Sequence, residues 1–406
     1  MHKNVIVGQS GGPTAVINSS LAGVFQSAKV RGVKHVYGML NGVQGLFENR
    51  YVDLEENLSS ALHIELLKRT PSSYLGSCRY KLPNPADDER PYIHIFDLLK
   101  KLNIGYMFYI GGNDSMDTIN KLSVYADKIG SDIRMIGVPK TIDNDLYGTD
   151  HTPGYGSAAK YVAATIKEIV RDGLVYNQKN VTIVEVMGRN AGWLTGSSAL
   201  ARGEDNEGVD LICLPEVPFD KDHFISRVSE LQKEKPALVI AVSEGIRLPD
   251  GRYVCDLADD PGMTDAFGHR PLSGAGRYLA DMVAHVLKSK NRCVELSILQ
   301  RCAGHMVSRV DISEAYQVGG AAVRAALEGI TKQMVTLNRL GNDPYQVTTG
   351  LIPIFEVANK ESLVPLDWID ADKLHVKKPF LDYARPLIQA ELTPYYVEGL
   401  PQHIKL

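Results

Sequence analysis

The stretch from residue 105 to residue 145 constrains the fold more than any other part of this sequence. It begins with an apolar run at residues 105–110, which ends at a glycine pair, Gly111 and Gly112. A helical pattern follows, and a second apolar run at residues 133–138 ends in a polar turn. Together these segments predict one βαβ unit. Because ligands of open α/β sheets bind beyond the carboxyl ends of the strands, we expect both polar turns to line one crevice.

Short apolar runs and helical patterns alternate along the rest of the chain in the same way. Because this alternation recurs in both halves, we predict an α/β fold. It would comprise two similar three-layer α/β domains with mostly parallel sheets, and the active site would lie in the cleft between them. The other runs expected to be strands are residues 5–8, 37–40, 181–187, 209–213, 237–242 and 292–299.

The pattern divides the chain into three parts. The first domain is expected to comprise residues 1–154 together with about 300–345, and the second domain residues 155–299. The sequence from residue 340 is punctuated by proline and weakly patterned, so residues 346–406 are interpreted as a C-terminal extension that covers the domains. The segments expected to be loops are residues 42–47, 72–90 and 247–273.

The composition is that of an ordinary globular protein. Of the 406 residues, 44% are hydrophobic and 23% are charged, and the net charge of −4 gives no sign of nucleic-acid affinity. The five cysteines form no Cys-x-x-Cys pair, so they indicate neither a disulfide framework nor a zinc site. No apolar run has the length of a membrane span, and the first one is too early and too short for a signal peptide. We therefore expect a cytoplasmic protein.

The polar side chains at the predicted strand ends combine carboxylates with cations and glycine turns. Phosphoryl transfer needs this combination, because carboxylates hold Mg²⁺ and remove a proton. Cations and backbone N–H groups neutralise the charge on the transferred group. The carboxylate and amide groups are Asn113, Asp114, Asp143, Asp145 and Glu244. The cations are Lys140, Arg189, Arg292 and Arg301, and the glycine turns are Gly11-Gly12, Gly111-Gly112 and Gly188.

Other reaction classes lack their sequence motifs here. Gly11-Gly12 does not extend into Gly-x-Gly-x-x-Gly, and the chain has no Gly-x-x-x-x-Gly-Lys-Ser/Thr. It also has no Gly-x-Ser-x-Gly elbow and no histidine pair with metal-binding spacing on a helix. Taken alone, a glycine pair after a strand is also typical of an ordinary βα turn. Likewise, Arg79 and Lys81 could bind phosphate or simply form a solvated loop face.

The order and spacing of these motifs resemble those of the 6-phosphofructokinase family. The resemblance covers roughly residues 3–330 and implies the fold of that family. It also implies a phosphoryl-donor-binding first domain and a second domain that binds the sugar phosphate. The motifs that carry it are Gly11-Gly12, Gly111-Gly112-Asn113-Asp114-Ser115, Thr141-Ile142-Asp143-Asn144-Asp145, Val186-Met187-Gly188-Arg189, Glu244-Gly245 and Gln300-Arg301.

The resemblance implies a role for each matching residue. Asp143 would be the general base that takes the proton from the C1 hydroxyl of fructose 6-phosphate, with Thr141 and Asp145 in support. Arg292 would reach the 6-phosphate from a neighbouring subunit, which implies at least a homodimer and leaves a tetramer open. The implied substrate-binding residues are Gly11, Arg79, Thr141, Ile142, Asp143, Met187, Gly188, Arg189, Glu244, Arg292 and Arg301. The implied Mg²⁺ positions are Asn113 and Asp145.

Two positions bear on the identity of the phosphoryl donor. ATP-dependent members of the family are small, usually glycine, at the position of Asp114 and are glycine at that of Lys140. Asp114 would place a carboxylate where the α-phosphate of ATP should lie. Lys140 could instead neutralise the phosphate that leaves a short donor. Both residues are similar to those of pyrophosphate-dependent members. The alternative reading is that Asp114 caps a helix and Lys140 is a solvated loop cation.

The chain departs from the family pattern in four respects. Asn113 stands where the family usually has an aspartate tied to Mg²⁺, and an amide is a weaker ligand for this ion. Asn180 replaces an expected arginine, with Lys179 as a substitute, and Ile298 replaces a histidine or tyrosine that contacts the sugar phosphate. The effector-binding arginines of allosteric members fall at Leu21 and Phe25, which predicts a non-allosteric enzyme.

The sequence therefore predicts Mg²⁺-dependent, reversible phosphoryl transfer from pyrophosphate to fructose 6-phosphate, a step of glycolysis and gluconeogenesis. Its products would be fructose 1,6-bisphosphate and phosphate. An ATP-dependent or dual-donor 6-phosphofructokinase is the alternative enzyme. The alternative outside catalysis is a regulatory subunit that binds sugar phosphate without turnover, which Asn113 and Ile298 would favour.

Overall fold

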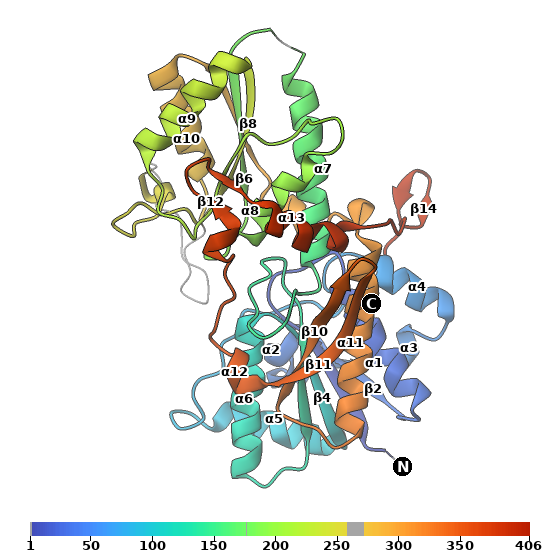
Figure 1. The fold of residues 1–406 in the computed structure, drawn as a ribbon. Coiled ribbons are helices and arrows are strands. Elements are labelled where there is room, and N and C mark those ends of the chain that lie inside the picture. The colour runs from blue at the N-terminus through green and yellow to red at the C-terminus, as the bar shows by residue number, and fades with distance from the viewer. Residues whose placement is uncertain (1, 176, 258–271) are drawn as a thin grey trace.

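Two mainly parallel sheets organise the chain, one in each half of the molecule (Figure 1). The computed structural model describes residues 2–175, 177–257 and 272–406. The first sheet has seven strands in the order β11-β10-β5-β4-β1-β2-β3. Only β3 and β11, at its two edges, run antiparallel to their neighbours. Its strands are β1 (Asn4–Gln9), β2 (Val36–Met39), β3 (Tyr51–Asp53), β4 (Ile104–Gly111), β5 (Arg134–Pro139), β10 (Gln333–Asn342) and β11 (Tyr345–Pro353).

Alternating side chains of the central strands fill two separate cores, one on each face of this sheet. In β4, Phe108 and Ile110 join the core under α1 and α11, whereas Met107 and Tyr109 join the core under α2, α5 and α6. This period of two buries both faces of the strand, as a three-layer α/β domain requires. The covering helices are α1 (Ile17–Val30), α2 (Gly42–Phe47), α5 (Arg90–Lys101), α6 (Asn113–Lys128) and α11 (Arg309–Leu327).

The second sheet is wholly parallel and has four strands in the order β7-β8-β6-β9. It too is buried on both faces, by α7, α8 and α13 on one and by α9 and α10 on the other. These features confirm the predicted α/β class. The strands are β6 (Asn180–Val186), β7 (Leu211–Cys213), β8 (Ala237–Ser243) and β9 (Lys290–Glu295). The helices are α7 (Tyr155–Gly173), α8 (Trp193–Gly196), α9 (Lys221–Glu234), α10 (Ala275–Leu287) and α13 (Lys378–Ala384).

The structure differs from the sequence-based expectation at three segments. The run expected as a strand at 292–299 is a strand only as far as Glu295, the end of β9, and residues 297–300 form a 3₁₀ helix. Residues 42–47 form α2 rather than a loop, because burial of Val43 and Leu46 outweighs the weak helix propensity of the two glycines there. The weakly patterned tail contributes β11, whose residues are only partly buried because it is an edge strand. The expected loop at 72–90 contains no helix or strand up to α5, and part of the expected loop at 247–273 lies outside the described residues.

The C-terminal segment contacts both domains. After β11, α12 (Ile354–Val357) packs beside α6 of the first domain, and the chain then passes to β12 (Ile369–Asp370) and α13 of the second (Figure 1). The chain end returns to the first domain, where the amide of Ile404 donates to Thr70 Oγ1 at 3.0 Å. Within the described residues, no helix combines the length and apolarity needed to span a membrane.

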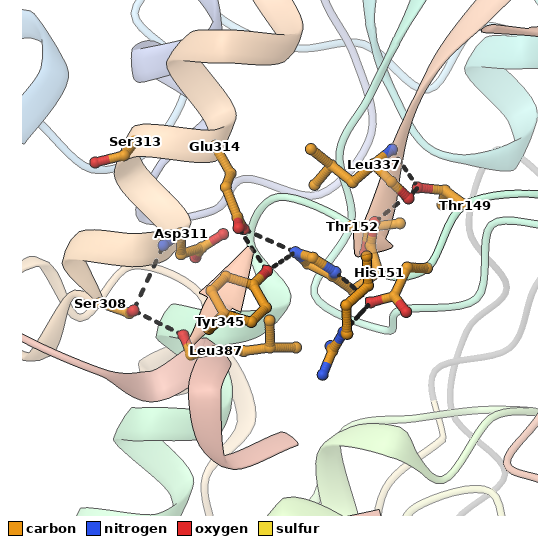
Figure 2. A network of polar contacts seen from close by, with 12 residues as sticks. Thr149, His151, Thr152, Ser308, Asp311, Ser313, Glu314, Leu337, Tyr345 and Leu387 are labelled. Atoms are coloured by element: carbon orange, nitrogen blue, oxygen red, sulfur yellow. Dashed lines mark hydrogen bonds and ion pairs between the residues drawn. The ribbon is translucent and has the colours of Figure 1, made fainter. Parts of the chain in front are cut away.

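A buried ionic network joins residues 150–151, in the loop between β5 and α7, to α11 and to the β10–β11 hairpin (Figure 2). The imidazole of His151 lies between two carboxylates, with Nδ1 2.7 Å from Asp150 Oδ1 and Nε2 2.7 Å from Glu314 Oε2. The hydroxyl of Tyr345 donates to Glu314 at 2.6 Å, and Arg339 donates to Asp150 at 2.9 Å. Burial alone would lower the pKa of His151, but its two carboxylate partners raise it to about 9.

This network predicts a stability change with pH. The pKa of His151 rises from about 6.5 in an unfolded chain to about 9, so its charged form stabilises the fold by about 3 kcal/mol. That contribution is complete below pH ~6.5 and is lost as the pH rises through ~9. We expect His151→Gln to lower the melting temperature most near pH 6.5, and the gap from wild type to narrow towards pH 10. Calorimetry across this range, with the exposed His403→Gln as control, tests this; a constant gap would contradict it.

Candidate active site

The turns that follow β1 and β5 meet at the carboxyl edge of the first sheet. Lys140 directly follows β5, and its Nζ donates to the backbone oxygen of Gly12, in the turn after β1, at 2.7 Å. Gly11 in the same turn has φ of +78°, and a Cβ atom there would lie 3.2 Å from Lys140 Nζ. The glycine turn therefore keeps its backbone close to the ammonium group, a geometry that a larger residue would crowd.

Lys140 is almost fully buried, with 2% of its surface exposed. Burial lowers the pKa of its ammonium group to about 8, with further lowering from Arg301 and Arg79, while Asp143 opposes the shift. The reading of Lys140 as a solvated loop cation is therefore wrong. A desolvated cation among other cations attracts a polyanion strongly, since little water screens the interaction.

Asp143 and Asp145 lie in the same turn as Lys140. Burial raises the pKa of Asp143, and the charges of Arg301 and Lys140 oppose the shift. Burial also raises the pKa of Asp145 to about 7, with further contributions from the charges of Asp143 and Glu361. Two carboxylates that repel each other in a desolvated turn favour a bound proton or cation.

Local hydrogen bonds fix the shape of this turn. Thr141 Oγ1 accepts from the backbone N–H of Asp143 at 3.1 Å. Asn144 has a left-handed φ of 59°, and its amide joins the turn to Tyr383 OH at 2.7 Å and to the N–H of Thr152 at 2.9 Å. Ile142 is buried in the core of the second domain, so its side chain anchors the turn to that core. The buried anchors hold Asp143 with little freedom.

The opposite wall comes from the turns after β6 and β8. Gly188 has φ of +140°, its N–H donates to Glu244 Oε1 at 3.4 Å, and its carbonyl accepts from Ser243 Oγ at 2.5 Å. A Cβ atom on Gly245 would lie 1.8 Å from the carbonyl oxygen of Arg189, so only glycine fits there. Burial raises the pKa of Glu244 to about 7, with a further contribution from Asp143.

Three of the predicted arginines line one cavity of about 300 Å³. Arg79 comes from the first domain, Arg189 from the turn after β6, and Arg301 from the segment after β9. Met187 and Glu244 also face this cavity. Three guanidinium groups around one space suit a dianionic phosphate, which arginine contacts in bidentate fashion. The cavity thus brings together residues that are far apart in sequence. Arg189 and Arg301 were expected there from their positions after apolar runs, whereas Arg79, in the 72–90 loop, was expected only from the family resemblance.

The glycine turn after β4 places Asp114 in the first turn of α6. The N-cap residue of this helix is Gly112, and no side chain caps the end, so the reading of Asp114 as a helix cap is wrong. Asp114 is exposed. Its neighbour Asn113 donates from Nδ2 to the backbone oxygen of Lys360 at 2.6 Å, and its Oδ1 accepts from the N–H of Asn359 at 2.9 Å. Both polar atoms of the Asn113 amide, including the oxygen that could bind a metal, are thus engaged by the C-terminal segment.

Arg292 lies apart from the cavity. It is in β9, and its Nη1 donates to Asp172 Oδ2 at 2.8 Å. The cavity begins at the carboxyl end of this strand, at Glu295, and continues at Ser297. Arg292 therefore does not join the other arginines of its own chain. Ile298, which stands where the family has a histidine or tyrosine, is 68% exposed.

Sequence reasoning missed two acidic residues of the site, Glu361 in the C-terminal segment and Glu185 in β6. Glu361 influences both Asp143 and Asp145 electrostatically, and its Oε1 accepts from Asn190 Nδ2 at 2.8 Å. Glu185, which caps α10 through the N–H of Gly276 at 2.6 Å, also lines the cavity. No periodicity marks Glu361, which lies in a short polar run after α12.

Comparisons with known proteins agree with this geometry. Residues 4–326 match the family described as phosphofructokinase. The chain is 42% identical to a pyrophosphate–fructose 6-phosphate 1-phosphotransferase of Rhodospirillum rubrum, over 97% of this chain and 96% of that one. It is 38% identical to the protein of the same name from Halomonas elongata, over 99% and 96%.

A solved structure shows the same fold. A pyrophosphate-dependent phosphofructokinase from Marinobacter aquaeolei superposes with a TM-score of 0.88 at 36% identity, covering 100% of this chain and 96% of that one. These similarities extend over both domains and the C-terminal segment. The chain belongs to the phosphofructokinase family.

Proposed function

We propose that this protein is a pyrophosphate-dependent fructose 6-phosphate 1-phosphotransferase. The observation that carries the proposal is the buried Lys140, whose Nζ lies 2.7 Å from Gly12 O in the glycine turn and which interacts electrostatically with Asp143. Lys140 thus supplies a cation for the leaving phosphate in the same turn as the proposed base, Asp143. The relatives named above carry this activity in their names.

The residues of the chain divide the chemistry between them. Asp143 accepts the proton of the C1 hydroxyl as that oxygen forms a bond to the transferring phosphorus. The bond from this phosphorus to the bridging oxygen of pyrophosphate breaks, and inorganic phosphate leaves beside Lys140. Arg189 neutralises charge on the transferring group. Glu244 and Met187 orient the sugar, and Arg79 and Arg301 supply positive charge for phosphate groups.

The carboxylates of the turn after β5 fit Mg²⁺. In the part of the chain that the structure describes, no three His, Cys, Asp or Glu side chains form a metal cage. Phosphoryl-transfer sites seldom use such a cage, because one or two carboxylates, substrate phosphates and water complete the octahedral shell. Asp145, with its pKa raised to about 7, would be stabilised by a nearby cation. Asp145 would hold Mg²⁺ together with the donor, and the ion would supply positive charge against the transferring phosphoryl group.

Donor choice is assigned to Asp114 and Lys140 together. Asp114 is exposed in the first turn of α6 and makes no side-chain cap there, so its carboxylate is available to repel a longer donor. An ATP-dependent or dual-donor enzyme remains the alternative, and the donor comparison below separates the two. Leu21 and Phe25 are buried in the first core, which supports the non-allosteric reading.

The assembly is proposed to be at least a dimer. Arg292 lies outside the cavity of its own chain, so it would contribute to the 6-phosphate site of a second copy, as the family resemblance implies.

A cytoplasmic location is also proposed. It suits substrates that are intracellular phosphorylated metabolites, and the buried thiols of Cys78 and Cys213 suit a reducing compartment.

Replacement of the base should abolish most turnover. We expect Asp143→Asn to lower kcat by about 10²–10⁴-fold, because the amide cannot accept the C1 proton. Binding of fructose 6-phosphate, measured by calorimetry, should persist. Near-wild-type turnover would show that Asp143 is not the base. Turnover by the purified wild-type chain alone also tests the alternative of a non-catalytic regulatory subunit.

Donor preference should respond to Asp114 and Lys140. We expect Asp114→Gly, alone and with Lys140→Gly, to lower kcat/KM for pyrophosphate and to raise kcat/KM for ATP. Removal of one repelling carboxylate should raise kcat/KM for ATP roughly tenfold or more. Asp114→Asn is the matched control, because it removes charge but keeps volume. Steady-state kinetics with each donor measures the change, and an unaltered preference in all three variants would rule out the proposed role.

A further inference from the structure

Residues 359–364, here called the strap, cross from the first domain to the second at the active site. On the first-domain side, both polar atoms of the Asn113 amide bond the strap backbone, to the carbonyl of Lys360 at 2.6 Å and to the N–H of Asn359 at 2.9 Å. Asn113 begins α6 directly before Asp114. The strap therefore fixes the turn that carries the proposed donor-selecting carboxylate.

The strap also pairs with the turn that holds the proposed base. Glu361 forms an antiparallel bridge with Leu146, and the N–H of Ser362 donates to the backbone oxygen of Asp145 at 2.7 Å. Both contacts use backbone atoms of the strap. They restrain the backbone within three residues of Asp143.

On its other side the strap bonds the second domain. Glu361 Oε1 accepts from Asn190 Nδ2 at 2.8 Å, next to Arg189. The indole N–H of Trp193 donates to Ser362 O at 2.8 Å. Glu216 Oε1 accepts from both the strap N–H of Val364, at 3.0 Å, and the N–H of Gly192, at 2.7 Å. The turn after β6 is thus bonded to the same short segment as the turns after β4 and β5.

We propose that the strap is a positioning element for phosphoryl transfer, with Asn113 as its anchor and Glu361 as the positioning residue for the Arg189 turn. This inference rests on the proposed function. Phosphoryl transfer requires the base, the donor turn and the charge-neutralising arginine to be held in one geometry, because a displacement of about 1 Å can cost 10²-fold in rate. These three groups lie on three turns and two domains, and the strap bonds all three turns.

The chemistry of the anchor explains why Asn113 is an amide. Its Nδ2 donates to a carbonyl while its Oδ1 accepts from an N–H, so the position needs one donor and one acceptor. An ionised aspartate has acceptors only, and one of its oxygens would face the carbonyl of Lys360 without a proton between them. Asn113 therefore replaces the aspartate of the family pattern because the amide bonds the strap. Mg²⁺ would then be held by Asp145 and the donor.

Asn113→Asp separates the two roles, because it is isosteric. We expect amide hydrogen exchange in residues 359–364 to quicken at least tenfold in the ligand-free protein, and kcat to fall about tenfold. The Mg²⁺ concentration at half-maximal rate should stay within twofold of wild type. A lower half-saturating Mg²⁺ concentration with unchanged exchange would overturn the proposal, since it would make position 113 a metal ligand. Ser362→Ala removes a side chain that makes none of these bonds and should leave exchange within twofold.

Glu361 provides an independent test. Glu361→Ala removes the acceptor for Asn190, and kcat/KM for fructose 6-phosphate should fall about tenfold. Glu361→Gln keeps an acceptor oxygen and should restore at least half of the loss, whereas equal damage by both variants would overturn the positioning role. These results do not depend on the identity of the donor. If ATP rather than pyrophosphate supports turnover, two results still decide the role of the strap. They are the hydrogen exchange of residues 359–364 and the ratio of kcat/KM between Glu361→Gln and Glu361→Ala.

Discussion

The rest of this site depends on the charge of the buried Lys140, which the neighbouring groups must compensate. An ammonium group that is 2% exposed is costly to desolvate, and the cost is offset here by the carbonyl of Gly12 and the charge of Asp143. The surrounding groups are also strained electrostatically, since Asp145 and Glu244 have pKa values raised to about 7. Bound phosphate groups would lower the electrostatic energy of the cations, and a divalent ion would lower that of the carboxylates, so both kinds of ligand suit this site.

Most of this arrangement could be predicted from the sequence because it follows from local rules. Parallel strands bring their carboxyl ends to one edge, so polar residues directly after apolar runs had to meet. Lys140, Asp143, Arg189 and Glu244 all follow strands in this way. The predicted α/β class was confirmed for the same reason. The alternation of buried runs and helices is local, and each run is long enough to be recognised.

The missed features depend on contacts that no local pattern encodes. The strap reaches Asn113 across about 246 positions, and does so with its backbone atoms, which any residue carries. β11 is an edge strand with partly buried residues, so its pattern is weak. The His151 network is similar in kind, because Glu314, Arg339 and Tyr345 come from three later elements. A single histidine in a sequence does not reveal two carboxylate partners.

The topology also orders the assembly of the protein during its synthesis. The first sheet leaves a gap in the sequence after β5, which is filled only when β10 pairs with it. All four strands of the second sheet are encoded within that gap, so they are synthesised before β10 extends the first sheet. A nascent chain that already includes Arg301 carries all the proposed catalytic side chains, but has neither β10 nor the strap. If the strap positions the catalytic groups as proposed, turnover is expected only once β10 and residues 359–364 have been added.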